Sequence, residues 1–417
     1  MSAFQSSRAT AFCWHRWRQI GTCLAIPPSI AVGKNYLSCG QPRRDRSAET
    51  SKTSETSQTR PGKLLRLDPT GAPGHTRTNE KGTVMKRWIG PLVALFAACA
   101  LAAPAVAQTA IKPAIVYSTG GKFDKSFNEG VSMGAEKFKK ETGVTVAEFE
   151  PTNETQFEQA QRRFAQRGQD PIVAVGFAQA VSLEKVAKEF PNIHFTIIDS
   201  VVDLPNVQSV VFKEQEGSFL VGVLAALASK SGKIGFVGGM DIPLVRKFQC
   251  GFEQGIKYAN PKAELISNMT GTTPAAWNDP GRGAELAKGQ FDRGVDVVYA
   301  AAGSTGIGIL QAAKDRGKLG IGVDSNQNYL HPGTMLTSML KRVDLATYNS
   351  FKAAQAGTWK GGTQVLGLKE GGVDWALDKD NEKLITADMK AKVNAAKADI
   401  ESGKIVVHDY MSNNSCK

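Results

Sequence analysis

Short apolar runs alternate with amphipathic stretches along the chain from Pro113 onward. The runs are rich in β-branched residues and almost uninterrupted by polar ones, for example "AIVYST", "IVAVGF", "HFTIID" and "VDVVYAAA". The stretches between them, such as "SLEKVAKEFPN", repeat their apolar residues at the spacing of one helix face. Continuous apolar strands separated by helices are typical of parallel sheets that helices cover on both faces. The pattern therefore predicts an α/β protein.

The same rhythm continues on both sides of one break. Five strand candidates precede the stretch "LAALASKSGK" and four follow it, with the same order of strand, glycine turn and helix. A folded region of about 310 residues exceeds what a single hydrophobic core usually serves. We therefore expect two similar, doubly wound parallel-sheet lobes, one formed by residues 108–231 and about 333–358, the other by residues 232–332 and about 359–417. A ligand would bind in the crevice beyond the carboxyl ends of the strands.

Two segments near the N-terminus are excluded from this fold. Residues 1–84 are rich in Ser, Thr, Arg, Pro and Gly without sustained periodicity, which favours a disordered or non-native leader. Residues 85–107 combine the basic start "MKRW", an apolar run and the small-residue end "AVA", the order of a secretory signal peptide. We therefore expect export to the periplasm, and the sequence leaves open whether translation begins at Met85. Lipoprotein processing at Cys99 is the alternative, although it would leave "ALAAPAVA" as an unusual mature terminus.

The charge of the folded part is nearly balanced. The whole chain has a formal net charge of +12, but residues 1–84 hold 13 Lys and Arg against 5 Asp and Glu, and the signal segment adds two basic residues. The remainder carries a net charge of about +2, which removes the electrostatic argument for a nucleic-acid partner. Of the six cysteines, Cys250 and Cys416 remain in this part, and the sequence leaves open whether they form a disulfide or stay separate thiols.

The first predicted strand leads into the turn "GGKFDKSFNEG", which is more polar and aromatic than a turn requires. Asp124 and Asn128 offer a hydrogen-bond acceptor and donor to a polar ligand, and Phe127 offers a flat face. The helix that starts near Ser126 offers its N-terminal amides. The alternative is structural, with Ser126 capping the helix and Phe127 filling the core. Because polar loop residues on a rigid scaffold often bind ligands, we predict that this turn forms one wall of a ligand cleft.

Later strand ends add candidates at the same edge. The segments "VGFAQA" and "IIDS" place Phe177 and Asp199 there, and we interpret Asp199 as a helix or turn cap. In "VYAAAGSTGIGILQAA", Gly303 and Ser304 lie at a strand-to-helix turn whose backbone can approach a sugar or another small polar ligand closely. The glycine spacing of this turn is not that of a dinucleotide-binding fingerprint.

One carboxylate and one lysine form the candidate sugar site. Asp324 in "GIGVDSNQ" follows a strand, and a carboxylate there can accept hydrogen bonds from vicinal hydroxyls with both oxygens. Lys341 in "SMLKRVD" is its candidate partner, although a solvated lysine is the commoner case.

Two aromatic residues are candidates for stacking against a ligand. Phe248 shares a helical spacing with Leu244, Phe252 and Ile256, which slightly favours the core over a ligand contact. Trp277 in "AAWNDPGRG" stands beside a turn at a helix start, where it suits stacking or a sugar face, or alternatively a hydrophobic staple.

The sequence of the folded part contains no complete catalytic set. Its histidines, His194, His331 and His408, are scattered, and no metal-binding spacing, nucleophile elbow or phosphate loop is complete. We therefore predict a binding protein and not an enzyme, without catalytic residues, a metal or a cofactor.

Several long motifs, in a fixed order, also resemble one family. They are "GGKFDKSFNEG", "EQEGSFLVGVLAAL", "KIGFVGGMDIPLVRKFQCGFEQG", "WNDPGRGAELA", "AAGSTGIGILQAA" and "VDSNQ". Over residues 111 to about 407, the chain resembles the basic membrane protein family of ABC-importer solute receptors, the PnrA-like purine nucleoside receptors. The resemblance implies a type I periplasmic binding fold, in which two lobes joined by three hinge crossovers close over a small-molecule solute. It also implies a monomeric receptor whose partner is an inner-membrane ABC permease with its ATPase.

The resemblance further implies roles for individual residues. In that family an asparagine of the first motif meets the base, aromatic residues sandwich the base, and an aspartate with a lysine holds the ribose. Those roles fall on Asn128, on Phe127 with Phe177 or Trp277, and on Asp324 with Lys341.

One position departs from the family pattern. Many relatives carry an aromatic residue where this chain has Ser132, four residues after the motif's asparagine, so we expect a looser base pocket. A nucleobase, a riboflavin-like molecule and another solute are therefore alternative ligands. Two further alternatives are a nucleoside-processing enzyme that uses Asp124 and Asp324, and a ligand-sensing domain of a membrane regulator.

Overall fold

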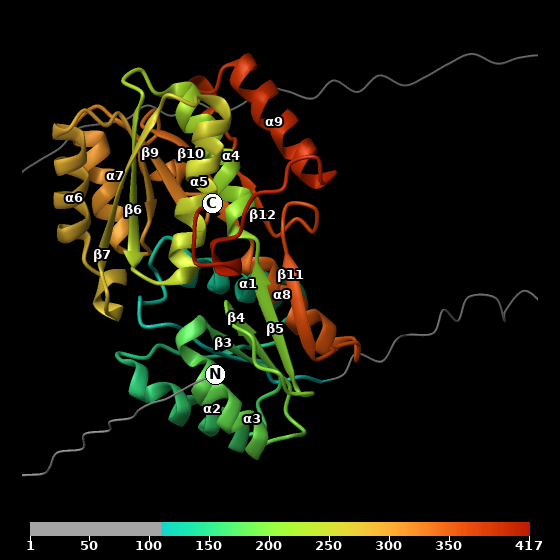
Figure 1. The fold of residues 1–417 in the computed structure, drawn as a ribbon. Helices are drawn as coiled ribbons and strands as arrows, with labels where there is room; N and C mark the ends of the chain where they lie inside the picture. The colour runs from blue at the N-terminus through green and yellow to red at the C-terminus, as the bar shows by residue number, and fades with distance from the viewer. Residues whose placement is uncertain (1–109) are drawn as a thin grey trace, which may run out of the picture. The chain divides into compact units, whose positions relative to one another are not determined.

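Two α/β lobes make up the part of the chain that the structure, a computed structural model, describes: residues 110–417 (Figure 1). Within these residues, twelve strands form two sheets of six strands each. The predicted fold class, with two doubly wound parallel sheets, is thereby confirmed. The predicted leader (residues 1–84), the signal peptide (residues 85–107) and the lipid-anchor alternative at Cys99 lie outside the described residues.

The first sheet is parallel throughout and forms lobe 1. From one edge its strands follow the order 2-1-3-4-5 of a doubly wound sheet, and a late strand joins the other edge. The central strands are buried along their whole length, as expected for a sheet covered on both faces. Across the sheet the strands are β11 (Gly362–Leu366), β5 (Val207–Phe212), β4 (Phe195–Ile198), β3 (Ile172–Val175), β1 (Ala114–Val116) and β2 (Ala147–Phe149).

The second sheet forms lobe 2 and repeats this order, except that its late edge strand is antiparallel to its neighbour. In both sheets the strand order reverses beside the first strand of the lobe, which is where open α/β sheets bind ligands. Across the sheet the strands are β12 (Val373–Trp375), β10 (Met335–Lys341), β9 (Leu319–Asp324), β8 (Val297–Ala301), β6 (Lys233–Met240) and β7 (Glu264–Gly271).

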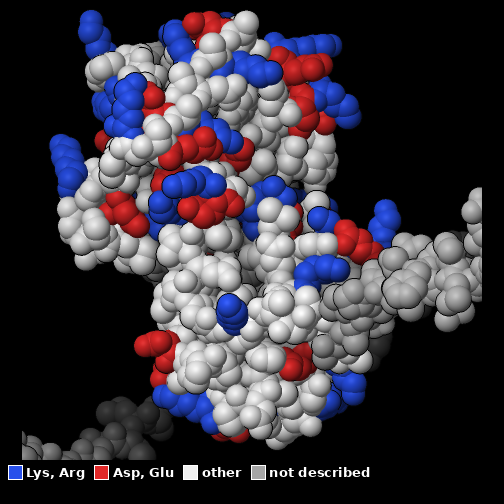
Figure 2. Space-filling view, turned by 90° about the vertical axis from the view of Figure 1, so that its right-hand side faces the viewer, with Lys and Arg blue, Asp and Glu red and all other residues white. Residues whose placement is uncertain are grey.

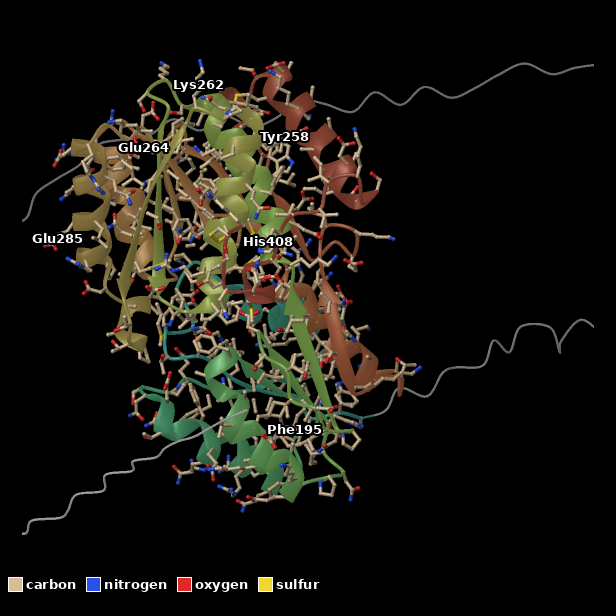
Figure 3. The ribbon with its side chains drawn as sticks, viewed as in Figure 1. Phe195, Tyr258, Lys262, Glu264, Glu285 and His408 are labelled. Carbon is tan, nitrogen blue, oxygen red and sulfur yellow. A yellow bond between two sulfur atoms is a disulfide. The ribbon has the colours of Figure 1, made fainter. Side chains whose placement is uncertain are left out.

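Helices cover both faces of the lobe 1 sheet (Figure 1). On one face α1 (Phe127–Thr142) packs against α8 (Val343–Gln355), and on the other α2 (Phe157–Gln166) packs against α3 (Ala180–Glu189). Separate hydrophobic clusters fill the two interfaces. Phe195, labelled in Figure 3, lies inside the second cluster and is fully buried.

Lobe 2 has the same layering. Helices α4 (Glu214–Ala228) and α5 (Pro243–Ala259) cover one face, and α6 (Pro280–Asp292) and α7 (Thr305–Asp315) cover the other. The last helix, α9 (Ala387–Glu401), packs against the outside of α4. Short 3-10 helices complete the described part of the chain, at Glu154–Gln156, Phe177–Gln179, Pro274–Trp277, Asn328–Leu330, Glu382–Leu384 and Tyr410–Ser412.

The chain crosses between the lobes three times, after β5, after β10 and after β11. The number of crossovers agrees with the expectation, but the division of the chain is wrong at three elements. The strand β10, expected in lobe 1, pairs with β9 in lobe 2, and β11, expected in lobe 2, pairs with β5 in lobe 1. The helix α4, expected in lobe 1, packs against α5 and β10 of lobe 2.

The physical reason is that a local pattern identifies a strand or a helix but not its partner. The helix α4 is apolar on nearly all sides, so it needs cover on all sides, which α5, β10, β12 and α9 of lobe 2 provide. The strand β10 is buried at almost every position and fits only beside another buried strand.

Charged side chains of both signs are interspersed over lobe 2 on the face shown in Figure 2. Lys262, Glu264 and Glu285 lie at the outer edge of this lobe in Figure 3. In residues 110–417, none of the helices is both long and apolar enough to cross a membrane.

Candidate functional site

A cleft of about 840 Å³ is lined by residues of both lobes. Lobe 1 contributes residues that follow β1, β3 and β4, and lobe 2 contributes the ends of β8, β9 and β10 together with the start of α5. The cleft therefore lies at the carboxyl ends of parallel strands, where the sequence analysis places a ligand crevice.

Most of the predicted site residues meet in this cleft. Asn128 and Ser304 are not among its lining residues. The eight that line it are Asp124, Phe127, Phe177, Phe248, Trp277, Gly303, Asp324 and Lys341.

Aromatic side chains dominate the apolar part of the lining. Phe127 and Phe177 come from lobe 1, and Phe248 and Trp277 come from lobe 2. Phe157, which sequence reasoning missed, joins them from the first residue of α2 and is 2% exposed. Phe248 belongs to the central hydrophobic cluster and also lines the cleft, so both interpretations of that residue apply.

A glycine makes room for Trp277. A Cβ at Gly239, in β6, would overlap the six-membered ring of Trp277, whereas a Cβ at Gly303 would lie 3.4 Å from the Trp277 backbone oxygen, an ordinary contact. Gly303 also has a φ of +57°, which favours glycine. The indole ring thus lies directly against the end of β6, a position that is open because Gly239 has no Cβ.

Asp124 lines the cleft but uses its carboxylate to cap α1. The carboxylate accepts hydrogen bonds from the backbone amides of Ser126 (2.9 Å), Asn128 (2.9 Å) and Glu129 (3.1 Å). The expectation that these N-terminal amides face a ligand is therefore wrong, because Asp124 occupies them. The alternative with Ser126 as the cap is also wrong, since the Ser126 side chain makes no capping hydrogen bond.

Asn128 holds the turn that lines the cleft. Its Oδ1 accepts hydrogen bonds from the amide (3.2 Å) and the hydroxyl (3.0 Å) of Ser118, and its Nδ2 donates to the carbonyl of Gly121 at 3.0 Å. The residue is fully buried. In this arrangement its polar atoms are engaged within the turn, and the base contact that the family resemblance implies for Asn128 stays a prediction.

Lys341 lies at the centre of the polar part of the cleft and is 3% exposed. Its Nζ lies 2.7 Å from Asp199 Oδ2 and 2.9 Å from Glu214 Oε1. Aromatic rings are favourable neighbours for such an ammonium group because their faces are electronegative. The rings with centroids 5.2 to 5.5 Å from Nζ are those of Phe127, Phe212 and Phe248.

Asp324 connects the two lobes. The Ser126 hydroxyl donates a hydrogen bond to Asp324 Oδ2 at 2.5 Å. Beside it, the Ser325 hydroxyl donates to the Ser126 carbonyl at 2.7 Å, and Gln327 Nε2 donates to the Lys125 carbonyl at 2.9 Å. The loop that begins at Asp324 is thereby tied to the N-terminus of α1, so the wall of the cleft is continuous across the lobes at this point.

Asp199 and Asp324 share an uncommon backbone conformation. Their φ angles are +69° and +63°, in the left-handed region that Asp enters more readily than most residues. Both stand at the carboxyl end of a strand, where this conformation turns the chain at the cleft. Strained residues of this kind cluster at binding sites.

Burial and mutual charge set the protonation of the cluster. Burial raises the pKa of Asp199 to about 6 against the opposing effect of Lys341, and burial also raises the pKa of Asp324. Burial alone would lower the pKa of Lys341, but the carboxylates of Asp199, Glu214 and Asp324 outweigh burial and raise it. The lysine therefore stays charged near neutral pH, while the two aspartates titrate closer to neutrality than exposed carboxylates do.

Asp124 is expected to make the stability of the protein depend on pH. Burial raises the pKa of Asp124 to about 7, although three backbone amides oppose the shift. Because this folded-state pKa lies above the unfolded value of about 4, the contribution of the group is full below about pH 4 and is lost as the pH rises through 7. We expect Asp124→Asn to remove this loss, which amounts to about 4 kcal/mol. Urea unfolding of both proteins between pH 4 and 8 measures it, and parallel pH profiles would contradict the assignment.

Of the two buried carboxylates that pair with Lys341, sequence reasoning gave Asp199 the wrong role and missed Glu214. The interpretation of Asp199 as a cap is wrong, because its carboxylate pairs with Lys341. Glu214, at the start of α4, pairs with the same lysine. No local signal distinguishes these residues from ordinary acidic residues at turns and helix starts. Ser132, where the family pattern has an aromatic residue, is buried in α1 and is not a lining residue, so the predicted loss of a stacking face is not seen there.

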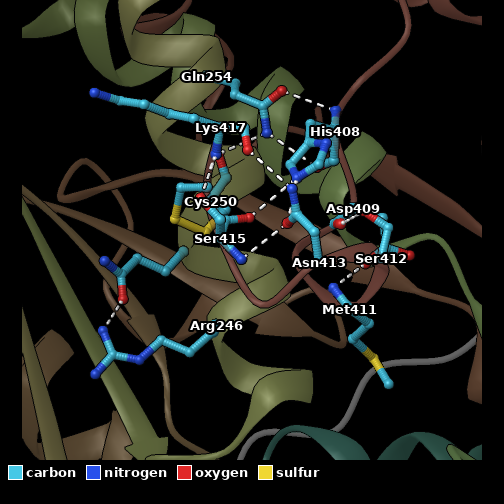
Figure 4. The surroundings of a disulfide bond; sticks show 12 residues. Arg246, Cys250, Gln254, His408, Asp409, Met411, Ser412, Asn413, Ser415 and Lys417 are labelled. Carbon is cyan, nitrogen blue, oxygen red and sulfur yellow. Dashed lines mark hydrogen bonds between the residues drawn. A yellow bond between two sulfur atoms is a disulfide. The ribbon is translucent and has the colours of Figure 1, made fainter. Parts of the chain in front are cut away.

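Cys250 and Cys416 form a disulfide, with Cα atoms 5.0 Å apart. The pairing that the sequence left open thus joins α5 to the end of the chain (Figure 4). Among residues 110–417, no group of three or more His, Cys, Asp and Glu side chains is placed to hold a metal ion.

Comparisons with known proteins agree with this arrangement. The family described as "ABC transporter substrate-binding protein PnrA-like" matches residues 111–409. The chain is 38% identical to an uncharacterised lipoprotein of Pyrococcus horikoshii over 285 residues, which are 64% of this chain and 69% of that protein. It is 32% identical to the ABC transporter nucleoside-binding protein BmpA of Lactococcus lactis over 323 residues, which are 72% of this chain and 90% of that protein.

A solved structure extends the similarity to three dimensions. A solute-binding protein of an ABC transporter system from Aeropyrum pernix matches the fold with a TM-score of 0.68 at 30% sequence identity. The match covers 74% of this chain and 95% of that one.

Proposed function

The chain belongs to the PnrA-like family of ABC transporter substrate-binding proteins, and from this premise we propose that it delivers a purine nucleoside from the periplasm to its ABC permease. The observation that carries the choice of ligand is the composition of the cleft. It joins a set of aromatic rings to buried aspartates and to Lys341, which pairs with Asp199.

The two parts of the cleft suit the two parts of a nucleoside. The rings of Phe127, Phe177 and Trp277 offer flat faces for a planar base. The carboxylate of Asp324 accepts hydrogen bonds from the ribose hydroxyls, beside the ammonium of Lys341. Asp199 adds an acceptor, because its Oδ1 is buried and has no hydrogen-bond partner among the described residues. A ligand hydroxyl or amino group would satisfy this oxygen.

The charge of the cleft favours a nucleoside over a nucleotide. Asp124, Asp199 and Asp324 line it, and Lys341 is the cation among the lining residues. A phosphate group would enter a site in which carboxylates outnumber ammonium groups, and like charges repel strongly in a buried environment. The nucleoside-binding description of the Lactococcus lactis relative supports the same ligand class.

We propose binding by lobe closure, without turnover of the ligand. The three crossovers are the hinge of such a motion, and the hydrogen bonds of Asp324 and Ser325 to Ser126 are contacts between the lobes that closure would form. An enzyme would need an acid and a base aimed at one bond. The carboxylate of Asp124 caps α1, which leaves it poorly suited to that role.

The proposed export can be tested separately from binding. Expression from Met85 in a Gram-negative host, followed by mass spectrometry of the mature product, should find a chain that begins at Gln108 in the periplasm. A lipid-modified Cys99 would support the alternative, which the lipoprotein description of the Pyrococcus horikoshii relative makes worth testing. An uncleaved cytoplasmic product would contradict export.

The ligand proposal is tested by thermal unfolding and calorimetry of the full chain. Adenosine, guanosine and inosine should raise the unfolding midpoint, because a ligand that binds only the folded state stabilises it by mass action. Free bases, AMP, GMP, riboflavin and sugars are the comparison set. A shift with bases alone would remove the ribose role of Asp324, and a shift with riboflavin or a sugar but no purine would replace the proposed ligand. Product formed on prolonged incubation would contradict binding without turnover.

Gly239→Ala is expected to weaken nucleoside binding about tenfold, because the new methyl group displaces the ring of Trp277 and removes one stacking surface. Gly271→Ala is the matched control. Residue 271 ends the neighbouring strand β7, and its Cβ would lie 3.5 Å from that of Ala276, an ordinary contact. Calorimetric titration of both variants measures the effect, and equal affinities would show that Trp277 does not contact the ligand.

A further inference from the structure

Ionised side chains of alternating sign connect the cleft with the C-terminal segment, which is formed by residues 402–417 after α9. The Lys341 ammonium lies 2.7 Å from Asp199 and 2.9 Å from Glu214. The second carboxylate oxygen of Glu214 lies 3.0 Å from the Lys247 ammonium, which lies 3.4 Å from Asp409. Each inner member is thus shared by two partners of opposite charge. We call these five residues the charge chain.

The inner residues of the charge chain are almost fully buried. The side chains of Lys341, Glu214 and Lys247 are 2%, 1% and 8% exposed, whereas that of Asp409 is 34% exposed. Screening by water is weak between such buried groups, so a change of charge at one end of the charge chain alters the electrostatic energy of the other members. Burial alone would lower the pKa of Lys247, but the carboxylates of Glu214 and Asp409 outweigh burial and raise it.

Lys247 also touches the first crossover between the lobes. Its ammonium donates a hydrogen bond of 2.6 Å to the carbonyl of Phe212, the last residue of β5. Glu214, two residues later, begins α4 on the other side of that crossover. Lys247 therefore holds two groups in place. One is the backbone at Phe212, where the polypeptide leaves lobe 1, and the other is the Glu214 carboxylate that faces Lys341.

The C-terminal segment that brings Asp409 to Lys247 is fastened to α5. The His408 amide donates to Gln254 Oε1 at 2.8 Å, and Gln254 Nε2 donates back to the His408 carbonyl at 3.0 Å. Cys250 holds the end of the segment through its disulfide with Cys416. Figure 4 shows these contacts around the disulfide, and Figure 3 places His408 beside α5.

The fastening points share one face of α5 with the lysine. Lys247, Cys250 and Gln254 are spaced by three and four residues, the spacing of neighbours on a helix surface. The first turns of the same helix carry Phe248 into the cleft. A displacement of the C-terminal segment therefore acts on a helix that forms part of the ligand site.

We propose that Asp409 is a positioning residue for ligand binding, and that the disulfide-held C-terminal segment keeps it in place. Without the Asp409 charge, Glu214 is the remaining carboxylate of the charge chain beside the Lys247 ammonium, which stays fixed by the Phe212 carbonyl, and Lys247 draws Glu214 away from Lys341. Lys341 then pairs more closely with Asp199, and both groups become less available to a ligand. The inference rests on the proposed function, because it takes the ligand to bind at Lys341 and Asp199.

The first test is a titration of the full-length protein with guanosine. Asp409→Asn is expected to weaken binding about two- to thirtyfold, the range of mutations that act on a site through intermediates. The asparagine can still accept the hydrogen bond that Asp409 Oδ1 receives from the Met411 amide, so the local turn is kept. Asp409→Glu should restore most of the affinity. Asp399→Asn is the control, because Asp399, in α9, pairs with Lys404 of the C-terminal segment but lies outside the charge chain.

A double-mutant cycle shows whether the effect passes through Lys247. In a Lys247→Met background, Asp409→Asn should change the affinity by less than twofold, because its partner is already gone. Cys416→Ser should weaken binding in the wild-type background and have little further effect with Asp409→Asn. Equal losses from Asp409→Asn in both backgrounds would overturn the proposal, as would an unchanged affinity in the single variant.

A readout without ligand keeps this inference separate from the proposed function. Asp409 and Lys341 are not in contact, so independent effects on stability would add. The charge chain predicts that the losses in unfolding midpoint from Asp409→Asn and Lys341→Met are not additive. If the wild type binds no nucleoside but the losses are coupled, the proposed ligand is wrong while the charge chain stands. If guanosine binds and the losses are additive, the charge chain is wrong while the ligand stands.

Discussion

Replacing Lys341 with Met is expected to destabilise the protein by about 3–5 kcal/mol at pH 7.5, because breaking a buried ion pair leaves an uncompensated charge. The variant removes the cation that Asp199 and Glu214 share at 2.7 and 2.9 Å. Asp324 loses the same neighbour, since Lys341 opposes the rise of its pKa. Urea unfolding followed by circular dichroism measures the loss. Lys352→Met, at a partly exposed lysine on α8, is the matched control and should change stability by less than about 1 kcal/mol.

The same variant should recover stability as the pH falls. Without Lys341, burial is left to raise the pKa of Asp199 and Asp324 further above their unfolded values. A carboxyl group with a raised folded-state pKa contributes most stability when it is protonated, and this contribution is lost as the pH rises through that pKa. The difference between Lys341→Met and the wild type should therefore shrink between pH 7.5 and pH 5. A constant difference across that range would mean that packing, and not charge, explains the loss.

The place of the cleft could be predicted because it depends on repeating local patterns. Apolar runs followed by glycines and polar residues mark the carboxyl ends of parallel strands, and such ends share one edge of a sheet. Asp124, Gly303 and Asp324 were identified in this way, and the structure places all three in the cleft lining. The long motifs added the family, which no single pattern of apolar residues could specify.

The partners of these residues could not be predicted because they lie far away in the sequence. Asp199 is 142 residues from Lys341, and its local pattern is the same whether it caps a turn or pairs with a buried lysine. Glu214 looks like a common acidic residue in the first turn of a helix, and only the crossover between the lobes places it against Lys341. The partners of strands β10 and β11 could not be predicted for the same reason.

Asn128 and Phe157 illustrate a second limit. The motif identifies the turn around Asn128, but only the three-dimensional arrangement shows that its amide group is engaged within that turn. Phe157 begins a helix without any unusual neighbour in sequence, and it reaches the cleft because α2 starts at its rim. Side-chain direction depends on packing, which a local pattern does not contain.

Asp324→Asn is expected to weaken nucleoside binding about a hundredfold, because hydrogen bonds to an ionised acceptor are roughly twice as strong as those to a neutral one. The fold should be kept. Asparagine enters the left-handed region at least as readily as aspartate, so the φ of +63° is tolerated, and its side-chain oxygen can still accept from the Ser126 hydroxyl. Alanine would add backbone strain at this position, so Asn is the better substitution for testing the charge alone.

The ligand series tests the role that we assign to this carboxylate. If Asp324 holds the ribose, the variant should lose affinity for guanosine while its affinity for free guanine stays within about twofold of the wild type, since the base does not use that carboxylate. Asp315→Asn, at the last residue of α7, should leave both affinities and the unfolding midpoint unchanged. Equal losses for guanosine and guanine would assign Asp324 to the base or to the contact between the lobes. An unchanged guanosine affinity would remove Asp324 from the site and leave Asp199, with its unpartnered oxygen, as the acceptor for the sugar.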